Sequence, residues 1–117
     1  MVHFGNHLKM VVRREERETL RAFYQGLLGC GLASSAPNLD LFQFSNGFML
    51  AVHYDDQCLS QDQSIKATWL ELKTNAPGSL KKKLLDRGVV EVEYFDKEHF
   101  YFQSPGGQVY RMVGHGK

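Results

Sequence analysis

The sequence has little of several features that would indicate a particular class of protein. No apolar run approaches the roughly 18 residues that a membrane-spanning helix needs. The net charge of +1 gives no electrostatic reason to expect binding to nucleic acid or to an anionic membrane. Residues 1–6 lack the basic and apolar regions of a signal peptide. We therefore expect a cytoplasmic protein with neither a nucleic acid nor a membrane as its partner.

Cysteine is also scarce, and no hydrolase motif can be recognised. Cys30 and Cys58 have no metal-ligand spacing, and without a secretion signal we expect them to stay reduced. The chain has no nucleophile elbow and no nearby set of Ser, His and Asp, which argues against a hydrolase. Apolar residues, by contrast, make up 43% of the 117 residues, enough to form a real core.

The most informative feature that is present is a pattern written twice, sixty residues apart. The matched positions are residues 10–12 and 70–72, Leu20 and Leu80, residues 42–43 and 102–103, and Gly47 and Gly107. A repeat of this length indicates a duplicated module and not a solenoid. We predict one domain over 1–117 made of two modules, about 7–54 and 66–113, joined by a polar linker at 55–65.

Each module is predicted to contain a strand, a helix and then three strands, from the period of its apolar residues and its glycine turns. In the first module the predicted elements are strand 7–12, helix 14–28, an edge strand or loop at 33–38, and the hairpin strands 39–44 and 48–54. In the second they are strand 66–73, a helix between Pro77 and Gly88, and strands 89–94, 99–103 and 108–113.

Local motifs in this order resemble the vicinal oxygen chelate superfamily, which includes glyoxalase I, extradiol dioxygenases, and fosfomycin- and bleomycin-resistance proteins. The letters LRAFY at 20–24 and LLG at 27–29 are similar to the family's first helix. The run LLDRGV at 84–89 looks like the end of its second helix, and FYFQSPGGQ at 100–108 is similar to its aromatic strand and glycine turn. The resemblance implies an α+β fold, in which paired βαβββ modules form curved mixed sheets around a shared cleft.

The resemblance also indicates where metal ligands would lie, because metal-dependent members carry them on the first and fourth strands of each module. These positions fall at His7 and Ala67 on the first strands, and at Ala51 and Arg111 on the fourth. Alanine has no donor atom, and arginine is a permanent cation with no lone pair to offer. We therefore expect no metal ion and no other cofactor, and the usual enzymatic activity becomes the less favoured interpretation.

The function that the resemblance then implies is that of a metal-free protein, similar to the bleomycin-resistance type, which binds a small organic molecule in the cleft. We expect a homodimer, with the cleft closed within one chain or by exchange of modules. The sequence does not identify the ligand. The predicted ligand-binding residues are His7, Lys9, Met49, Ala51, His53, Ala67, Trp69, Glu71, Tyr101, Gln103 and Arg111.

Two other hypotheses stay open for the same residues. A metal-dependent lyase, isomerase or dioxygenase would hold a divalent metal ion with His7, His53 and Glu71. An interaction module would have its cleft filled by Trp69, Glu71 and Arg111, with Arg111 pairing to Glu71. In a binding protein the same pair would instead contact the ligand, and Trp69, the only tryptophan, would offer a flat wall to a planar or cationic molecule.

Overall fold

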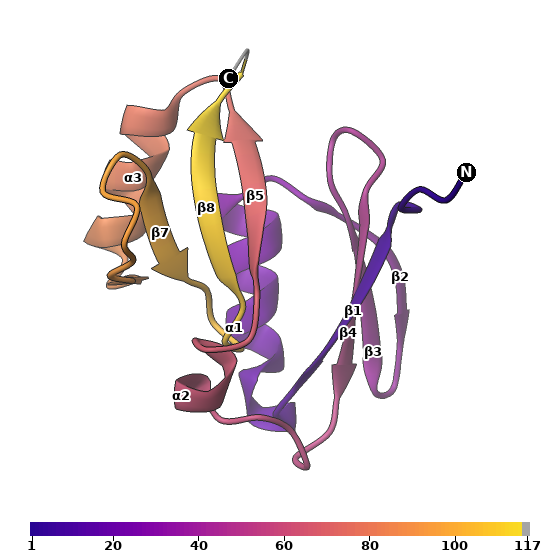
Figure 1. Ribbon diagram of the computed structural model, residues 1–117. Helices are drawn as coiled ribbons and strands as arrows, with labels where there is room; N and C mark the ends of the chain where they lie inside the picture. Colours follow the sequence, from indigo (N-terminus) through magenta and orange to yellow (C-terminus); the bar gives the residue numbers. More distant parts are fainter. Residues whose placement is uncertain (116–117) are drawn as a thin grey trace. The chain divides into compact units, whose positions relative to one another are not determined.

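The computed structural model describes residues 1–115, and the chain divides into two units, residues 1–59 and 60–117. Each unit contains a four-stranded mixed sheet with helical segments (Figure 1). The boundary between the units lies within residues 55–65, the predicted linker. No helix of the described residues is long and apolar enough to cross a membrane. The two units, called unit 1 and unit 2, are described separately below.

Unit 1 has the sheet order β1-β4-β3-β2, with β1 parallel to β4 and the other neighbours antiparallel. Its elements are β1 (His7–Val12), a 3-10 turn η1 (Arg14–Glu16), α1 (Arg17–Arg21), a π-helix η2 (Ala22–Leu27), β2 (Gly31–Ala36), β3 (Leu39–Gln43) and β4 (Met49–Tyr54). The segment predicted as one helix is therefore helical in three successive forms. It ends where predicted, at Gly29, whose φ of 79° is the left-handed conformation that glycine adopts without strain.

The helix of unit 1 packs its apolar residues on one face of the sheet. Leu20 and Tyr24 are fully buried, and the ring of Tyr24 stacks on Phe42 of β3 with 5.3 Å between the ring centroids. Phe42 pairs with Leu50 of β4, which is also buried. The residues that alternate with Phe42 along β3 and with Leu50 along β4 therefore occupy the face of this sheet away from α1 and η2.

Unit 2 repeats the arrangement with the sheet order β5-β8-β7-β6. Its elements are α2 (Gln61–Ser64), β5 (Trp69–Thr74), α3 (Pro77–Asp86), β6 (Val90–Glu91), β7 (Phe100–Gln103) and β8 (Val109–Gly114). Leu84 of α3 is fully buried, and the ammonium of Lys81 lies 4.9 Å from the ring centroid of Phe100. Because Phe100 pairs with Met112 of β8, α3 covers the sheet face to which both belong.

The first strand of unit 2 begins later than predicted, because a short helix precedes it. Ser60 and Gln63 form a capping box: the Ser60 hydroxyl accepts from the Gln63 amide at 3.1 Å, and the Gln63 side chain accepts from the Ser60 amide at 2.9 Å. The amide of Ala67 then donates to the Ser64 carbonyl at 3.1 Å. Ala67, predicted on the strand, therefore lies in the turn that follows α2.

The strand predicted at 89–94 is also shorter than expected. Only Val90 and Glu91 pair with β7, and the Val92 amide makes one more bond, to the Tyr101 carbonyl at 2.8 Å. The chain then leaves the sheet. In this irregular segment the Asp96 carboxylate accepts from the Glu98 amide at 2.9 Å, a local turn that competes with strand pairing.

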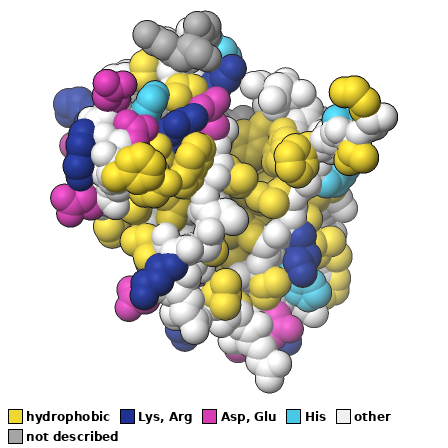
Figure 2. Space-filling model, in the orientation of Figure 1, with side chains coloured by type: hydrophobic (Ala, Val, Ile, Leu, Met, Phe, Trp, Pro, Cys, Tyr) yellow, Lys and Arg dark blue, Asp and Glu magenta, His cyan; other side chains and the backbone are white. Residues whose placement is uncertain are grey.

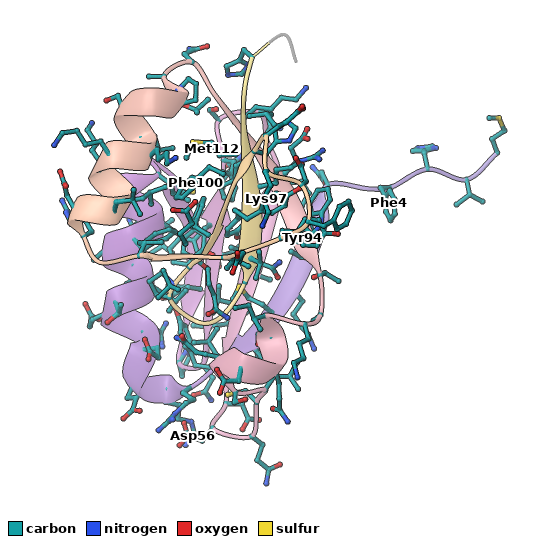
Figure 3. All side chains as sticks on the ribbon, turned by 60° about the vertical axis from the view of Figure 1, so that its left-hand side comes forward. Phe4, Asp56, Tyr94, Lys97, Phe100 and Met112 are labelled. Atoms are coloured by element: carbon teal, nitrogen blue, oxygen red, sulfur yellow. The ribbon has the colours of Figure 1, made fainter. Side chains whose placement is uncertain are left out.

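Apolar side chains also reach the surface, as the space-filling view shows (Figure 2). The exposed large apolar residues include Phe4, Leu59, Leu85, Val90 and Phe95. Leu85 follows the buried Leu84 on α3, but 42% of it is exposed. Phe4 lies in the extended segment that precedes β1 (Figure 3).

The sixty-residue shift holds for the last strands and fails for the first. Met49 of β4 and Val109 of β8 are 60 residues apart, but their partners, His7 on β1 and Trp69 on β5, are 62 apart. The residue of unit 2 that corresponds to His7 is therefore Trp69 and not Ala67. Because the difference is two residues, the side chains that share each sheet face are still those predicted.

Candidate functional site

The sheet of unit 2 carries a charged and aromatic group of residues on the face opposite α3. Glu71, Arg111 and Tyr101 are adjacent on β5, β8 and β7. Arg111 Nη2 donates to Glu71 Oε2 at 2.6 Å, and the guanidinium carbon lies 4.3 Å from the ring centroid of Trp69. The predicted ion pair between Glu71 and Arg111 is therefore present. We call Trp69, Glu71, Tyr101 and Arg111 the Arg111 site.

Aromatic rings surround the guanidinium group. Trp69 meets Tyr101 edge to face with 5.7 Å between the ring centroids, and meets Tyr94 in the same way at 6.4 Å. The ring centroids of Tyr94 and Tyr101 are 4.8 Å apart. Such contacts fix the rings relative to one another and leave a mostly apolar wall beside one cation.

Asp96 joins this site from the irregular segment between β6 and β7. Its Oδ2 atom lies 2.7 Å from His99 Nδ1, accepts from the Tyr101 hydroxyl at 3.0 Å, and is 3.9 Å from Arg111 Nη1. The hydrogen bond to His99, followed by the one from the Glu98 amide, lowers the pKa of Asp96 to about 2. Asp96 is therefore a carboxylate at neutral pH and links the segment to both strands.

The guanidinium of Arg111 is only partly satisfied by the protein. Its Nε atom is buried and has no hydrogen-bond partner among residues 1–115. The hydrogen bond to Glu71 is the main cause of a raised pKa for Arg111, so the group stays charged. The Arg111 and Glu71 side chains are nevertheless 25% and 34% exposed, so that solvent or a ligand can reach the pair.

Unit 1 contains a second arginine–carboxylate cluster, which is closed. The Asp40 carboxylate is fully buried and accepts from Arg17, Arg21, Ser35 and the Tyr54 hydroxyl at 2.8–3.3 Å. Burial by itself would raise the pKa of Asp40, but the bonds from Arg21 and Arg17 hold it well below its usual range. This cluster ties the helix to β3 and β4, and the protein's own donors occupy both oxygens of the carboxylate.

The predicted site residues of unit 1 lie on the sheet face away from α1 and η2. His7 pairs with Met49, and Lys9 pairs with Ala51. The His7 ring is exposed, and its Nδ1 lies 2.8 Å from the side-chain oxygen of Asn6. His53 lies four residues beyond Met49 on β4, about 13 Å along the strand direction. His7 and His53 are therefore not neighbours on the sheet.

The remaining predicted residues have structural roles. The Gln103 amide donates to the carbonyls of Gln61 and Gly107 at 2.8 and 2.9 Å, which holds α2 against the β7–β8 turn. Ala67 lies in the turn before β5 and contributes nothing to the Arg111 site. Residues 1–115 contain no group of three His, Cys, Asp or Glu side chains that could hold a metal ion.

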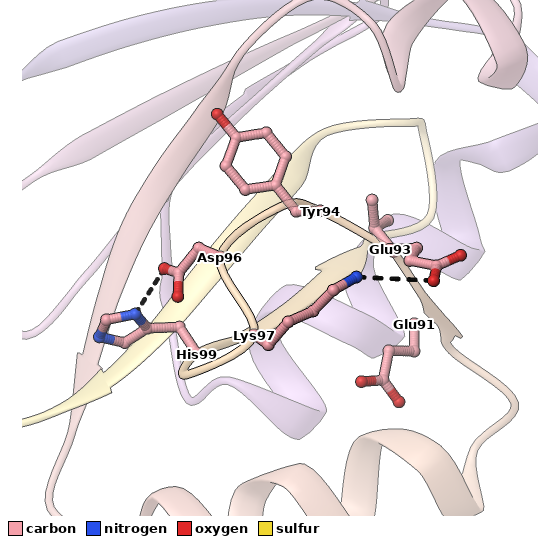
Figure 4. Close-up of a pocket in the computed structure, with 7 residues that line it drawn as sticks. Glu91, Glu93, Tyr94, Asp96, Lys97 and His99 are labelled. Carbon is pink, nitrogen blue, oxygen red and sulfur yellow. Dashed lines mark hydrogen bonds and ion pairs between the residues drawn. The ribbon is translucent and has the colours of Figure 1, made fainter.

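A cavity of about 370 Å³ lies beside the Arg111 site, within the segment between β6 and β7 (Figure 4). It is lined by Glu91, Val92, Glu93, Tyr94, Asp96, Lys97 and His99. Sequence reasoning missed this feature because half of the segment, residues 92–94 and 99, was predicted to be strand. The Asp96–His99 spacing of three residues, which allows a side-chain contact across a turn, was the available signal.

No protein-family model and no curated protein matches the sequence. Solved structures, in contrast, match nearly all of it. The manganese and sulfate complex of the fosfomycin-resistance protein FosX from Listeria monocytogenes aligns with a TM-score of 0.75 at 12% identity, covering 97% of this chain and 91% of that one.

Two further solved structures match with similar TM-scores, identities and coverage. A glyoxalase/dioxygenase from Nostoc punctiforme gives a TM-score of 0.72 at 13% identity, covering 96% of this chain and 90% of that one. A glyoxalase/bleomycin resistance protein/dioxygenase from Alicyclobacillus acidocaldarius gives 0.67 at 20% identity, covering 95% and 90%. At such identities the similarity concerns the fold.

Proposed function

This chain has the paired βαβββ fold of the glyoxalase, bleomycin-resistance and dioxygenase structures, and we propose that it uses that fold to bind a small organic molecule without a metal ion. The binding residues would be those of the Arg111 site, on the face of the β5–β8 sheet opposite α3. The observation that carries the proposal is the incompletely satisfied guanidinium of Arg111 beside the only tryptophan.

The donor set argues against a resident metal ion. The fourth-strand positions hold Ala51 and Arg111, and the register places Trp69, not a histidine, at the first-strand position of unit 2. None of these side chains offers a lone pair that suits a divalent metal. The carboxylate of Glu71 is already bonded to Arg111 at 2.6 Å. The residues present therefore do not fit a metal centre.

The contrast between the two arginine–carboxylate clusters supports a binding role for the second. Around Asp40 the carboxylate is fully buried and both of its oxygens accept hydrogen bonds from the guanidinium groups, as in a structural network. Around Arg111 a buried donor is left without a partner, which costs free energy unless a ligand or a rearrangement satisfies it. A partly exposed guanidinium beside an aromatic wall favours recognition of a planar molecule that carries an oxygen acceptor.

The charges around Arg111 favour a neutral acceptor over an anionic one. Glu71 and Asp96 are both carboxylates near the same guanidinium, at 2.6 and 3.9 Å. A ligand carboxylate would add a third negative charge beside one cation, whereas an amide or ketone oxygen would not. The proposed ligand class is therefore a small planar molecule with a neutral carbonyl oxygen.

Naphthamide, a neutral planar amide, tests this proposal against naphthoate, its carboxylate counterpart. We expect naphthamide to shift the indole N–H signal of Trp69 in an NMR titration and to bind more tightly than naphthoate. Arg111→Ala should weaken naphthamide binding by about tenfold or more, because a hydrogen bond to a charged group contributes about 1.5–3 kcal/mol.

Arg87→Ala is the matched control, since Arg87 is an exposed arginine of the same unit, just after α3. It should leave naphthamide binding unchanged. Equal weakening by the two arginine substitutions, or tighter binding of naphthoate than of naphthamide, would contradict the proposed ligand class.

The metal-dependent alternative has its own test. For untagged protein purified without chelator, we expect far less than one Zn, Mn, Ni or Fe per chain by elemental analysis, because the donor set is incomplete. A stoichiometric metal that is lost in His7→Ala would instead support a metal-dependent lyase, isomerase or dioxygenase.

One observation favours the non-catalytic interaction module as a second candidate. Arg111 is already paired with Glu71 and already lies over the Trp69 ring, so that the protein's own side chains occupy part of the site. If neither naphthamide nor naphthoate moves the Trp69 signal while the wild-type protein is folded, this second function becomes the better one.

A further inference from the structure

Residues 92–99, which we call the strap, cross from β6 to β7 without joining the sheet after Val92. Glu91 and six residues of the strap line the cavity of about 370 Å³, and none of residues 92–99 is buried. Phe95, near its middle, is 83% exposed. A segment with so few buried apolar contacts belongs to the low-stability end of a structure.

The strap nevertheless covers one edge of the Arg111 site. Tyr94 packs on Tyr101 and meets Trp69 edge to face. In the close-up, the Tyr94 ring points away from the Glu93–Lys97 pair (Figure 4). The strap therefore has no buried side chain and one aromatic residue in contact with the binding wall.

Asp96 is the charged anchor of the strap. Its Oδ2 atom accepts from the Tyr101 hydroxyl on β7 and lies 3.9 Å from Arg111 Nη1 on β8. The other ion pair of the strap, between Lys97 and Glu93, is exposed and internal to the segment, so it does not connect the strap to the sheet. Releasing Asp96 would leave Tyr94, the bond from the Val92 amide to the Tyr101 carbonyl and the short β6 pairing as the described contacts to β5 and β7.

We propose that the strap is a movable cover for the ligand site around Arg111 and Trp69, and that Asp96 is the residue that positions it. The closed strap places Tyr94 against the aromatic wall, and the open strap exposes Trp69 to a ligand. Because none of its residues is buried, the strap can move without displacing core side chains. Its role as a cover rests on the binding function proposed above, whereas its mobility does not.

Acrylamide quenching of Trp69 fluorescence tests the mobility without any ligand. In Asp96→Asn we expect the quenching constant to rise by about twofold or more, because the indole loses the protection of Tyr94. Asp96→Glu, which keeps the carboxylate, should restore most of the protection. Asp86→Asn removes an exposed carboxylate paired with Lys82 on α3 and is the matched control, in which quenching should not change.

Tyr101→Phe provides a second variant if Asp96→Asn fails to fold, since it removes one bond to Asp96 and keeps the ring. This variant should also increase the quenching constant, but by a smaller factor than Asp96→Asn. Quenching equal to wild type in the folded Asp96→Asn protein, or in Tyr101→Phe if that variant alone folds, overturns the proposal. An increase in quenching in Asp96→Asn that Asp96→Glu does not reverse also overturns the proposal.

The rates of naphthamide binding and release then test the proposed cover independently of the proposed binding site. In Asp96→Asn we expect its association and dissociation rates both to rise, as they do when a cover opens more often. Raised quenching with no naphthamide binding to any form would show a mobile strap and refute the binding function alone. Naphthamide binding with rates that Asp96→Asn leaves unchanged would refute the cover and leave the binding function standing.

Discussion

Asp40→Asn will lower the free energy of unfolding by about 3–5 kcal/mol, the usual cost of removing one partner of a buried ion pair. Asp40 has no exposed surface, and its carboxylate accepts from both Arg17 and Arg21. Asparagine has nearly the same shape but no charge, so Arg17 would lose its carboxylate partner and Arg21 would keep only the exposed Glu18, 3.8 Å away. Urea unfolding monitored by circular dichroism measures the loss.

Asp86→Asn is the comparison, because it removes a carboxylate from an exposed pair. Asp86 lies 3.0 Å from the Lys82 ammonium, and their side chains are 63% and 78% exposed. Such surface pairs contribute about 0–1 kcal/mol. A loss for Asp40→Asn that is no larger than the loss for Asp86→Asn would show that the cluster does not stabilise unit 1.

Gly107→Ala will destabilise the protein more than Gly47→Ala, although both glycines hold the same position of the duplicated hairpin. Both have positive φ, 107° and 89°, so alanine at either position costs about 1–2 kcal/mol. A Cβ on Gly107 would also lie 2.9 Å from Cβ and Oγ of Ser64 at the end of α2. Overpacking of this kind adds about 1–3 kcal/mol, so we expect about 2–5 kcal/mol in total.

Gly47→Ala is the built-in control, since no atom lies within 4 Å of a Cβ on Gly47. The two variants are compared by their free energies of unfolding, measured in urea titrations with Trp69 fluorescence as a second probe. Equal losses would mean that the contact between Ser64 and the β7–β8 turn carries no energy.

Much of the fold could be predicted because glycine turns and apolar periods are local signals. Gly29 and Gly88 end their helices with φ of 79° and 80°, as their places after apolar stripes indicated. The hairpin at Gly47 and its counterpart at Gly107 were predicted for the same reason. These features depend on a few neighbouring residues, which is why the sequence reveals them.

Features that depend on competition between two local structures could not be predicted. Ser60 and Gln63 form a capping box that makes a helix of residues expected to be linker, and this helix delays β5. Asp96 bonds to the Glu98 amide and to the Tyr101 hydroxyl, and the strand expected at 89–94 stops at Glu91. In both cases a polar side chain decides where the chain leaves regular structure.

The candidate site was predicted where it depends on strand register alone. Glu71 faces Arg111 because parallel β5 and β8 pair these two residues, and Trp69 lies on the same face by strand alternation. Asp96 and His99 were missed, because an irregular segment brings them to the site. Asp40 was visible as a charged residue in phase with Phe42 on an apolar strand, a pattern that indicates a paired buried charge.

The difference of two residues between β1 and β5 limits how the duplicated halves can be exchanged or redesigned. A one-residue change in that spacing would turn Leu70 and Leu72 away from α3 and bring Glu71 towards it, so only even offsets preserve the core. Anyone grafting an imidazole from a metal-binding protein of similar fold into unit 2 should therefore align the graft on Trp69. Alignment by residue count would place it at Ala67, in a turn outside the sheet.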